Sequence, residues 1–560
     1  MTTPILRAQH VLPALLAALL AACGGGSSDS GSDAASSSAS SRAASSAASS
    51  TASSAAASSS AASSTASSAV SSASSVSSST RAGYYATKTN YQPQQAVSSY
   101  EAAPAGFTPV YTQLVARHGT RGLSSMKYDD AVLNMWTRAK ADGALTALGE
   151  QLGPDVEKIM KANFLMGYGV SGISTPGYGN LTQVGVSEHK QLAVRLASRM
   201  NALFAGAGSR KIEIMNSGQD RAVDSSTFFS GSLASTLPAI AANVTTPVVN
   251  RYQLYFHKLS SSKDAVTDTA SINYAVLQAS LAYQQFAAAT DTNGYGMEVA
   301  AKIAAVRASA PVKAAARTVL ERLFTTAFLD KIDAGTYSFS NNSTRSYTSA
   351  DGLFTNSLTG DGKTKITSSV DAAALIYELY IIAPGMRNEA PVDFSQYMPL
   401  AQAEVFAGLQ DVDDFYNKGP SATEYGNLTW NMAQGLLKDF FDEVSTIAAG
   451  DSTRAARLRF SHAENLIPFI TAMGIEGAAT QLPKAQTYSY DNNPWRGETV
   501  SPMATNVQWD VYRDSAGTLI VKMLFNEKEV DFRASCASAR YGSSAHFYDF
   551  AKLKACYYPS

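Results

Sequence analysis

The chain carries, directly after an apolar stretch from Thr108 to Ala116, the sequence Arg117-His118-Gly119-Thr120-Arg121. Ligands of open α/β sheets bind at the carboxyl ends of strands, so an apolar segment that ends in ionisable side chains is typical of a strand that leads into a site. This stretch therefore predicts a buried strand that delivers two guanidinium groups and one imidazole to the edge of a sheet.

Two other stretches have the same organisation. Residues 212–214 alternate apolar and polar side chains before residues 216–221, which read Asn-Ser-Gly-Gln-Asp-Arg, and a helical pattern follows. Residues 458–460 alternate in the same way before residues 461–464, which read Ser-His-Ala-Glu, and a short helical pattern follows. We expect all three junctions to deliver polar or ionisable groups to a strand end.

These groups suit a phosphoryl group. The guanidiniums of Arg117, Arg121 and Arg221 would repel one another in one crevice unless an anion lay between them, and Arg forks match phosphate oxygens in geometry. His118 and the imidazole and carboxylate of residues 462–464 add a nucleophile, a hydrogen-bond donor and a general acid. The sequence therefore predicts phosphoryl transfer that needs no metal and no other cofactor.

The same residues carry a resemblance to a known family. Residues 117–121 resemble the RHGxR signature of the histidine acid phosphatases, in the branch that contains acid phosphatases and phytases. Residues 217–225, which include Arg221, resemble the second arginine segment of that branch. His462-Ala463-Glu464 is similar to the His-Ala-Glu variant of the multiple inositol polyphosphate phosphatases. The likeness runs in order from about Thr108 to Glu529, through Tyr416-Asn417-Lys418-Gly419 and through residues 524–528.

The resemblance implies a phosphomonoester hydrolase that removes phosphates from inositol polyphosphates such as phytate through a phosphohistidine intermediate. It assigns His118 as the nucleophile and Glu464 as the acid that protonates the leaving oxygen. It assigns the binding of the phosphoryl oxygens to Arg117, Arg121, Arg221 and His462.

Two more side chains are candidate substrate-binding residues, Lys127 by the resemblance and His257 by its place after an aromatic pair. Many members of the family have a bulky residue and Pro after the second Arg of the signature, whereas this chain has Gly122. Gly widens the allowed backbone conformations, so we expect a more flexible loop. His189 lies in a polar helical stretch and is expected to be a solvated surface residue.

Two other functions stay open. A broad-specificity acid phosphatase would have the same catalytic residues but would act on small phosphomonoesters and would need fewer basic groups in the cap domain. A non-catalytic surface lipoprotein that captures phosphorylated ligands would need neither His118 nor Glu464.

The first segment of the chain, residues 1–23, predicts an export signal. It contains Arg7, an apolar run from Val11 to Leu20, and then Ala21-Ala22-Cys23. The run is shorter than the roughly 20 apolar residues that a membrane-spanning helix needs. Its end resembles a bacterial lipobox, which implies cleavage before Cys23 and acylation of the thiol; simple secretion is the alternative. By the same resemblance, Gly24 favours the outer membrane, with the catalytic part in the periplasm or at the cell surface.

The segment 24–83 is expected to be a disordered tether, because from Ser27 to about Thr80 it is almost entirely Ser and Ala. Such a composition has no large apolar side chains whose burial could offset the entropy of ordering. A flexible chain of this length has an r.m.s. span of roughly 40 Å.

The rest of the 560-residue chain predicts a mixed-sheet α/β core domain from residues 84–255 and 400–560, with an inserted, mostly α-helical cap domain at 256–399. The insertion is expected because Ala-rich helical stretches separate the second junction from the third. Residues 507–525 alternate around a turn and predict a hairpin. Cys536 and Cys556 are expected to pair once Cys23 is acylated, since an exported chain meets oxidising conditions.

The composition excludes some classes of function. Lys+Arg 44 and Asp+Glu 45 give 44 − 45 = −1, and 16% of the residues are charged. A protein that binds nucleic acid through a global basic field is therefore excluded. The expected partners are the inositol polyphosphate substrate and a membrane lipid anchor, and the protein is expected to be a monomer.

Overall fold

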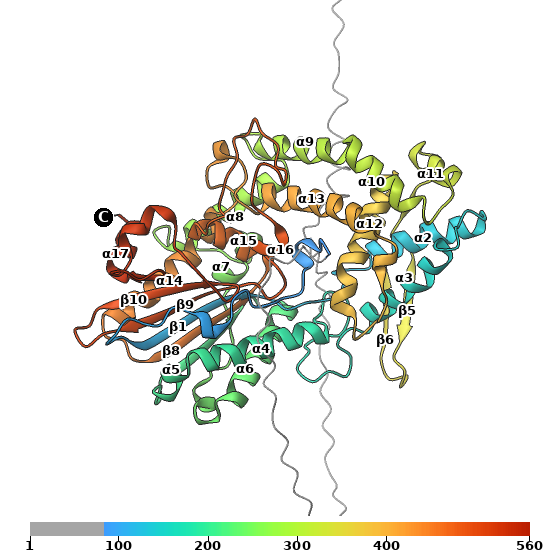
Figure 1. The fold of residues 1–560 in the computed structure, drawn as a ribbon. Helices are drawn as coiled ribbons and strands as arrows, with labels where there is room; N and C mark the ends of the chain where they lie inside the picture. Colours follow the sequence, from blue (N-terminus) through green and yellow to red (C-terminus); the bar gives the residue numbers. More distant parts are fainter. Residues whose placement is uncertain (1–82, 560) are drawn as a thin grey trace, which may run out of the picture. The chain divides into compact units, whose positions relative to one another are not determined.

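The predicted strand before Arg117 is β1 (Thr108–Arg117) in the computed structural model, which describes residues 83–559 (Figure 1). Its residues from Tyr111 onward are buried. The predicted export signal, Cys23 and all but the last residue of the predicted tether lie outside the described residues.

Within the described residues, β1 belongs to a mixed eight-stranded sheet with the order β11-β10-β9-β1-β8-β2-β3, and β12 lies beside β10. The strands β1, β8, β2 and β3 are parallel, whereas β9, β10, β11 and β12 pair antiparallel with their neighbours. The other strands are β2 (Lys211–Asn216), β3 (Val248–Val249), β8 (Arg454–Ser461), β9 (Asn506–Arg513), β10 (Leu519–Phe525), β11 (Lys528–Val530) and β12 (Phe547–Asp549). The predicted mixed-sheet α/β fold and the predicted hairpin, β9–β10, are both confirmed.

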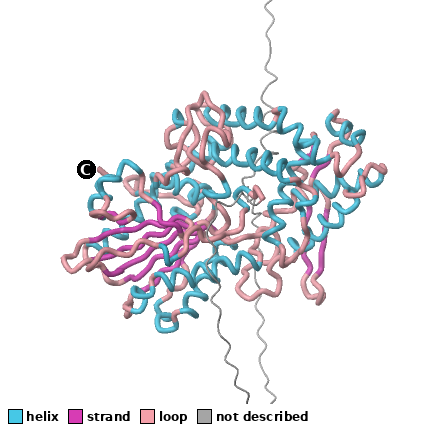
Figure 2. Tube along the Cα trace, in the orientation of Figure 1, coloured by secondary structure: helices cyan, strands magenta, loops and turns pink. Residues whose placement is uncertain are grey.

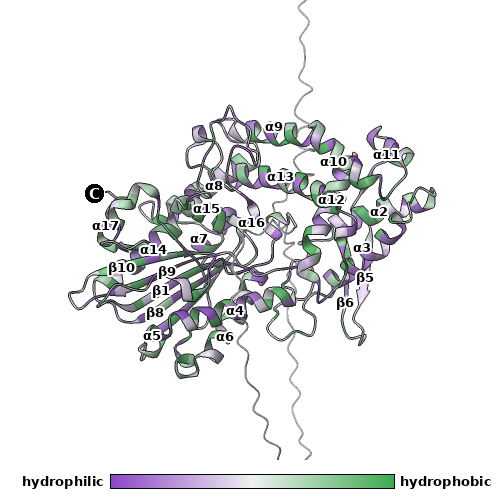
Figure 3. Ribbon diagram, viewed as in Figure 1, coloured by the Kyte–Doolittle hydropathy of each residue, from purple (hydrophilic) through white to green (hydrophobic). Residues whose placement is uncertain are grey.

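Both faces of the sheet are covered. Leu114 and Ala116 of β1 belong to one hydrophobic cluster, and Tyr111 and Val115 belong to another on the opposite face, as the two-residue period of a strand requires. Figure 3 shows hydrophobic residues along these strands. Replacing Leu114 with Ala would cost about 2–5 kcal/mol, because the side chain is fully buried.

Helices from distant parts of the chain pack on the two faces. The first face is covered by α4 (Gln183–Arg199), α5 (Asn201–Ala205) and α6 (Asp220–Thr236). The second face is covered by α14 (Gln434–Ala448), α15 (Ala463–Met473) and α17 (Phe550–Tyr557), with α7 (Arg251–Leu254), α8 (Ile272–Ala287) and α9 (Tyr295–Arg307) in the same cluster. The helix α16 (Gly497–Val500) precedes β9.

A further hydrophobic cluster lies away from the sheet (Figures 1 and 2). It is built by α2 (Tyr128–Ala141), α3 (Gly149–Phe164), α10 (Ala310–Leu320), α11 (Thr326–Asp333), α12 (Ser369–Ile382) and the first half of α13 (Leu400–Asn417). Two short antiparallel strand pairs border it: β4 (Phe339–Ser340) pairs with β7 (Lys365–Ile366), and β5 (Thr344–Thr348) pairs with β6 (Thr355–Thr359).

The membership of this cluster bears on the predicted cap. α2 and α3 come from the segment assigned to the core, yet they pack with α10 and α12 from the predicted insertion. The boundaries of core and cap therefore stay a prediction. Among the described residues, the stretch Ser369–Met386 is long and apolar enough to cross a membrane, but 83% of it is buried, as in the core helix of a globular domain.

The C-terminal part is closed by a disulfide between Cys536 and Cys556, as predicted. Cys536 lies in a 3-10 helix (Ala534–Ala539), and Cys556 lies in α17. The chain-entropy model assigns about 3 kcal/mol to a loop of this size.

Candidate functional site

The carboxyl ends of β1, β8 and β2 meet at one edge of the sheet. Arg117 is in register with Ser461 of β8, and Asn216 of β2 is in register with Phe460. The backbone N–H of His118 donates to the carbonyl of Ser461 at 2.8 Å. The three predicted junctions therefore converge, because they end three adjacent parallel strands.

Arg117 is almost fully buried beneath this edge. Its Nη1 donates to the carbonyl oxygens of Thr87 and Ser501, both at 2.6 Å. Burial lowers the pKa of Arg117 to about 10, which leaves the guanidinium charged at neutral pH. Two backbone acceptors therefore fix a permanent positive charge at the base of the site.

His118 is held in one tautomer. Its Nδ1 lies 2.9 Å from the carbonyl oxygen of Gly119, which can only accept, so Nδ1 carries the proton and Nε2 carries the lone pair. Burial, followed by the charge of Arg221, lowers the pKa of His118 well below its usual value. The imidazole is therefore neutral near pH 7, the form that a nucleophile needs.

Arg121 and Arg221 extend the positive field around His118. Arg121 is 5% exposed, and its Nη1 donates to the carbonyl of Gly122 at 2.8 Å. Arg221 lies in the first turn of α6, where the positive end of the helix dipole also favours anions. Since both charges lower the pKa of His118, the arrangement favours a bound anion next to the imidazole.

His462 lies beside His118, with 5.4 Å between the ring centroids. Its Nε2 is 2.8 Å from Oγ of Ser217, and it is fully buried as the N-cap residue of α15. Burial lowers its pKa well below the usual value, so the ring is neutral and can donate one hydrogen bond to an oxygen.

Glu464 follows in the first turn of α15, and its side chain is 14% exposed. Its Oε1 is 3.9 Å from Nζ of Lys418, which also lies 2.7 Å from Oδ1 of Asp414. Burial is the largest single influence and opposes a charge on Glu464, but the ammonium of Lys418 and the other groups around the carboxylate together outweigh it and hold the pKa of Glu464 well below its usual value. Lys418 belongs to the motif at the end of α13 that the sequence singled out, and the structure places it beside Glu464.

The two candidate substrate-binding residues have different neighbours in the structure. His257 is buried with its ring centroid 6.3 Å from that of His462, and its Nδ1 is 3.1 Å from Oδ1 of Asn465. Burial lowers the pKa of His257 to about 4. Lys127 immediately precedes α2, with Nζ 4.8 Å from the ring centroid of Tyr128. Their substrate-binding roles stay predictions.

Close backbone approaches explain two of the glycines. A Cβ on Gly119 would lie 2.5 Å from the carbonyl oxygen of Gly185, and a Cβ on Gly185 would lie 2.0 Å from that of Thr120. A Cβ on Gly122 would lie 2.2 Å from Oδ1 of Asn163. At Gly122 the structure therefore gives a reason for glycine other than the expected loop flexibility, namely the space that the Asn163 amide occupies.

Glu188 supports the loop from below and was missed by sequence reasoning. Its carboxylate accepts hydrogen bonds from the N–H and the hydroxyl of Thr120, each at 2.7 Å, and from the N–H of Tyr91 at 2.8 Å. The prediction that His189 is a solvated surface residue is wrong: the ring is fully buried against Phe460. A run of Glu-His-Lys looks like a solvated helix face, and no local signal distinguishes it from this buried one.

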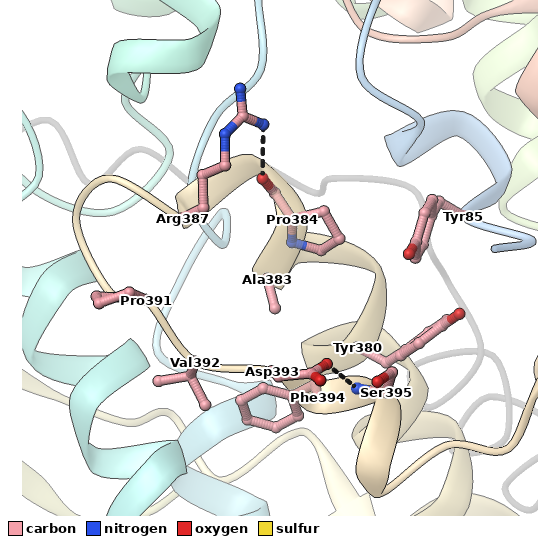
Figure 4. Close-up of a pocket in the computed structure, with 10 residues that line it drawn as sticks. All are labelled: Tyr85, Tyr380, Ala383, Pro384, Arg387, Pro391, Val392, Asp393, Phe394 and Ser395. Carbon is pink, nitrogen blue, oxygen red and sulfur yellow. Dashed lines mark hydrogen bonds between the residues drawn. The ribbon is translucent and has the colours of Figure 1, made fainter. Parts of the chain in front are cut away.

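A separate hollow lies beside the start of the described chain (Figure 4). Its lining combines aromatic, proline and polar residues: Tyr85, Tyr380, Ala383, Pro384, Arg387, Pro391, Val392, Asp393, Phe394 and Ser395. Its guanidinium, Arg387, donates to the carbonyl of Pro384 at 3.2 Å. The lining contains none of the predicted site residues, so the convergent edge of the sheet is the better candidate for chemistry.

Comparisons with known proteins show which family the chain resembles. The family model of the histidine phosphatase superfamily (branch 2) matches residues 110–526. No curated protein matches the sequence. A phytase from D. castellii has the same fold, with 12% identity, a TM-score of 0.55, and coverage of 85% of this chain and 84% of that chain.

The similarity is stronger to the multiple inositol polyphosphate phosphatase from Bifidobacterium longum. Its complex with inositol hexasulfate is 32% identical, with a TM-score of 0.74, and the match covers 85% of this chain and 97% of that chain. Its complex with phosphate gives the same values. A family model that spans most of the folded residues and a relative of this similarity lead to one conclusion: the chain belongs to branch 2 of the histidine phosphatase superfamily.

Proposed function

We propose that this protein removes phosphates from inositol polyphosphates such as phytate through a phosphohistidine intermediate. The observation that carries the proposal is the hydrogen bond from Nδ1 of His118 to the carbonyl of Gly119. This bond leaves the lone pair on Nε2, in a site whose positive field comes from Arg117, Arg121 and Arg221. A neutral nucleophile among fixed cations suits the attack on a phosphate dianion.

In the first step, Nε2 of His118 attacks phosphorus in line with the leaving oxygen. A P–N bond forms, the P–O bond to the inositol breaks, and the electron pair of that bond leaves with the oxygen. Arg117, Arg121, Arg221 and His462 stabilise the charge on the phosphoryl oxygens, since this transition state depends mainly on positioning and electrostatics. Glu464 transfers a proton to the leaving oxygen.

In the second step, the ionised Glu464 accepts a proton from water while the water oxygen attacks phosphorus. The P–N bond breaks, phosphate leaves, and His118 regains its lone pair. The same carboxyl serves as acid and then as base. Glu464 must be protonated when the substrate binds, and the negative charge of the substrate raises its pKa toward that state.

The substrate class rests on the relatives and on the charge of the site. The similar phosphatase from B. longum was solved with inositol hexasulfate, a polyanion with the shape of phytate. Around His118, the cations Arg117, Arg121 and Arg221 are joined by Lys127 on the side of Arg121. This excess of positive charge favours a substrate with several phosphates over a simple monoester.

The test compares three substrates side by side on the purified protein: phytate, a sugar phosphate and p-nitrophenyl phosphate. Released phosphate is measured over time, and the inositol phosphates are separated by ion exchange. We expect stepwise appearance of lower inositol phosphates and the highest kcat/KM on phytate. Faster turnover of the sugar phosphate would support the broad-specificity acid phosphatase, and binding without any turnover would support the non-catalytic ligand-binding lipoprotein.

We also propose that the protein is exported as a lipoprotein and anchored in the outer membrane, with the catalytic part in the periplasm or at the cell surface and the protein a monomer. The support is the sequence Leu20-Ala21-Ala22-Cys23 after an apolar run. Radiolabelled palmitate should label the wild type, and Cys23→Ser should abolish the label and release the activity from the membrane fraction. Size-exclusion chromatography with light scattering of a detergent-free Cys23→Ser protein gives the oligomeric state.

A further inference from the structure

The first described residues, 83–91, form a strap across the catalytic edge. Their backbone is tied down from several sides: the hydroxyl of Tyr380 donates to the carbonyl of Gly83 at 2.7 Å, and the hydroxyl of Tyr377 donates to that of Tyr84 at 2.6 Å. Further along, the N–H of Met503 donates to the carbonyl of Thr89 at 2.9 Å. The strap is therefore a fixed part of the folded protein.

The strap turns sharply next to Arg117. Tyr84 and Ala86 have φ of 52° and 45°, values that residues other than glycine rarely adopt. A 3-10 turn (Ala86–Lys88) follows, and it presents the carbonyl of Thr87 to Nη1 of Arg117 at 2.6 Å. The next residue, Lys88, is thereby placed beside the Arg117 and Arg121 guanidiniums, which both act on its charge.

Lys88 lines a small hollow on the side of Arg121. The other lining residues come from three different parts of the chain: Arg121, Leu123, Ser124, Tyr128, Glu378 and Ile382. Among residues 83–559, the ammonium of Lys88 makes no hydrogen bond and no ion pair within 4 Å. Burial and the charges of Arg121 and Arg117 lower its pKa to about 7. This ammonium lies next to two guanidiniums and has no hydrogen-bonded partner among the described residues, so it can donate to a bound anion.

Glu378 balances part of this charge. It lines the same hollow, raises the pKa of Lys88, and is itself held by a hydrogen bond of 3.3 Å from Nε2 of Gln410. Three cationic side chains act on this carboxylate, namely Lys88, Lys127 and Arg121, and the second carboxylate that acts on it, Asp414, is paired with Lys418. The hollow therefore keeps an excess of positive charge beyond what one phosphoryl group uses.

We propose that Lys88 binds a second phosphate of the substrate, next to the phosphate that Arg117, Arg121 and Arg221 hold. The proposal rests on the proposed function, because only a polyphosphate carries that second group. The strap then has two tasks: the Thr87 carbonyl orients Arg117, and the Lys88 ammonium selects substrates with neighbouring phosphates.

The test measures binding of a polyanion independently of its turnover. Inositol hexasulfate and inorganic phosphate are used as competitive inhibitors of p-nitrophenyl phosphate hydrolysis by the full-length protein, its Lys88→Met and Lys88→Arg variants, and the control Lys158→Met. Lys158 is an exposed lysine of α3 that pairs with Asp155. The thermal unfolding midpoint of each variant shows whether the strap stays folded.

In Lys88→Met, Ki for inositol hexasulfate should rise about 10- to 100-fold, the usual worth of a charge-assisted hydrogen bond, while Ki for phosphate stays within about twofold. Lys88→Arg should restore most of the affinity, and Lys158→Met should resemble the wild type. Equal losses for both inhibitors, or none for either, would overturn the proposal. Failure of the proposed function gives a different result, namely a wild type that turns over p-nitrophenyl phosphate but not phytate.

Discussion

Nζ of Lys418 lies 3.9 Å from Oε1 of Glu464, and the same ammonium lies 2.7 Å from Oδ1 of Asp414. The pair is buried, with 8% of the Lys418 side chain exposed. Lys418 therefore stabilises the ionised form of Glu464, the form that accepts a proton from water in the proposed second step. The protonated form, which the proposed first step needs, depends on the negative charge that the substrate brings.

Replacing Lys418 with Met should move the alkaline limb of the pH–rate profile to higher pH. Activity that needs a protonated Glu464 falls as the pH rises through its pKa, and loss of the ammonium raises that pKa. The profile of kcat on phytate measures this shift. The matched control is Lys438→Met, which removes an exposed lysine from an equally spaced ion pair with Asp442. An unchanged limb in Lys418→Met would show that Lys418 does not set the pKa of the acid.

Glu464→Gln should slow transfer to alcohol leaving groups by about 10²- to 10⁴-fold, because the amide keeps the volume but has no proton to transfer. The loss should be much smaller for p-nitrophenyl phosphate, whose leaving group departs without protonation. Rapid-quench measurement of the first turnover isolates this step from hydrolysis of the intermediate. Equal losses on phytate and on the aryl ester would assign the acid to another residue, such as Asp220.

His118→Ala should lower turnover by about 10⁴-fold or more while the protein stays folded, since the nucleophile is lost and the core is untouched. Rapid mixing with radiolabelled phosphate ester and an alkaline quench should trap a phosphoenzyme in the wild type only. His546→Ala, which removes a partly exposed ring paired with Asp531, is the control. An alkali-stable phosphoenzyme in His118→Ala would contradict the assignment.

Turnover should survive dialysis against EDTA. The reason is that three guanidiniums around His118 supply the charge stabilisation that a metal ion supplies in many phosphoryl-transfer enzymes. Initial rates on p-nitrophenyl phosphate before and after dialysis measure the effect. Activity that disappears and returns with a divalent ion would refute this expectation.

His189 should make the folded state less stable at acidic pH. Burial lowers its pKa to about 3, whereas an unfolded chain has the ordinary histidine value, so between these pH values only the unfolded state binds the proton. Stability then falls as the pH falls. Urea unfolding at pH 4 to 6 measures the free energy of unfolding at each pH. Its slope against pH should be steeper for the wild type than for His189→Phe by about 1.4 kcal/mol per pH unit. Parallel slopes would show that His189 titrates alike in both states.

The convergence of the three junctions was predictable because each signal is local. Strand alternation, the polar segment after it and the helix pattern all lie within about a dozen residues, as at Ile212 to Arg221. The parallel pairing of β1, β8 and β2 then brings the ends together. The disulfide was predictable for a similar reason, since only Cys536 and Cys556 remain beyond Cys23.

Other parts depend on contacts that leave no local pattern. Glu188 and His189 are buried because Gly119 and Gly185 let two backbones cross, and neither glycine reveals its partner. The Thr87 carbonyl that holds Arg117 is a backbone acceptor, which every residue has. The packing of α2 and α3 with α12 joins segments more than two hundred residues apart, so the periodicity of each helix could not show it.

The backbone that carries His118 is hydrogen-bonded into the centre of the sheet. The N–H of Arg117 donates to the carbonyl of Thr505, the N–H of His118 to that of Ser461, and the N–H of Ala504 to the carbonyl of His118. Such a site does not unfold separately from the domain, because its geometry is lost only when the central strands separate. Residual activity after heating thus reports the population of intact domains, and substitutions that improve packing anywhere in the sheet should prolong the working life of the enzyme.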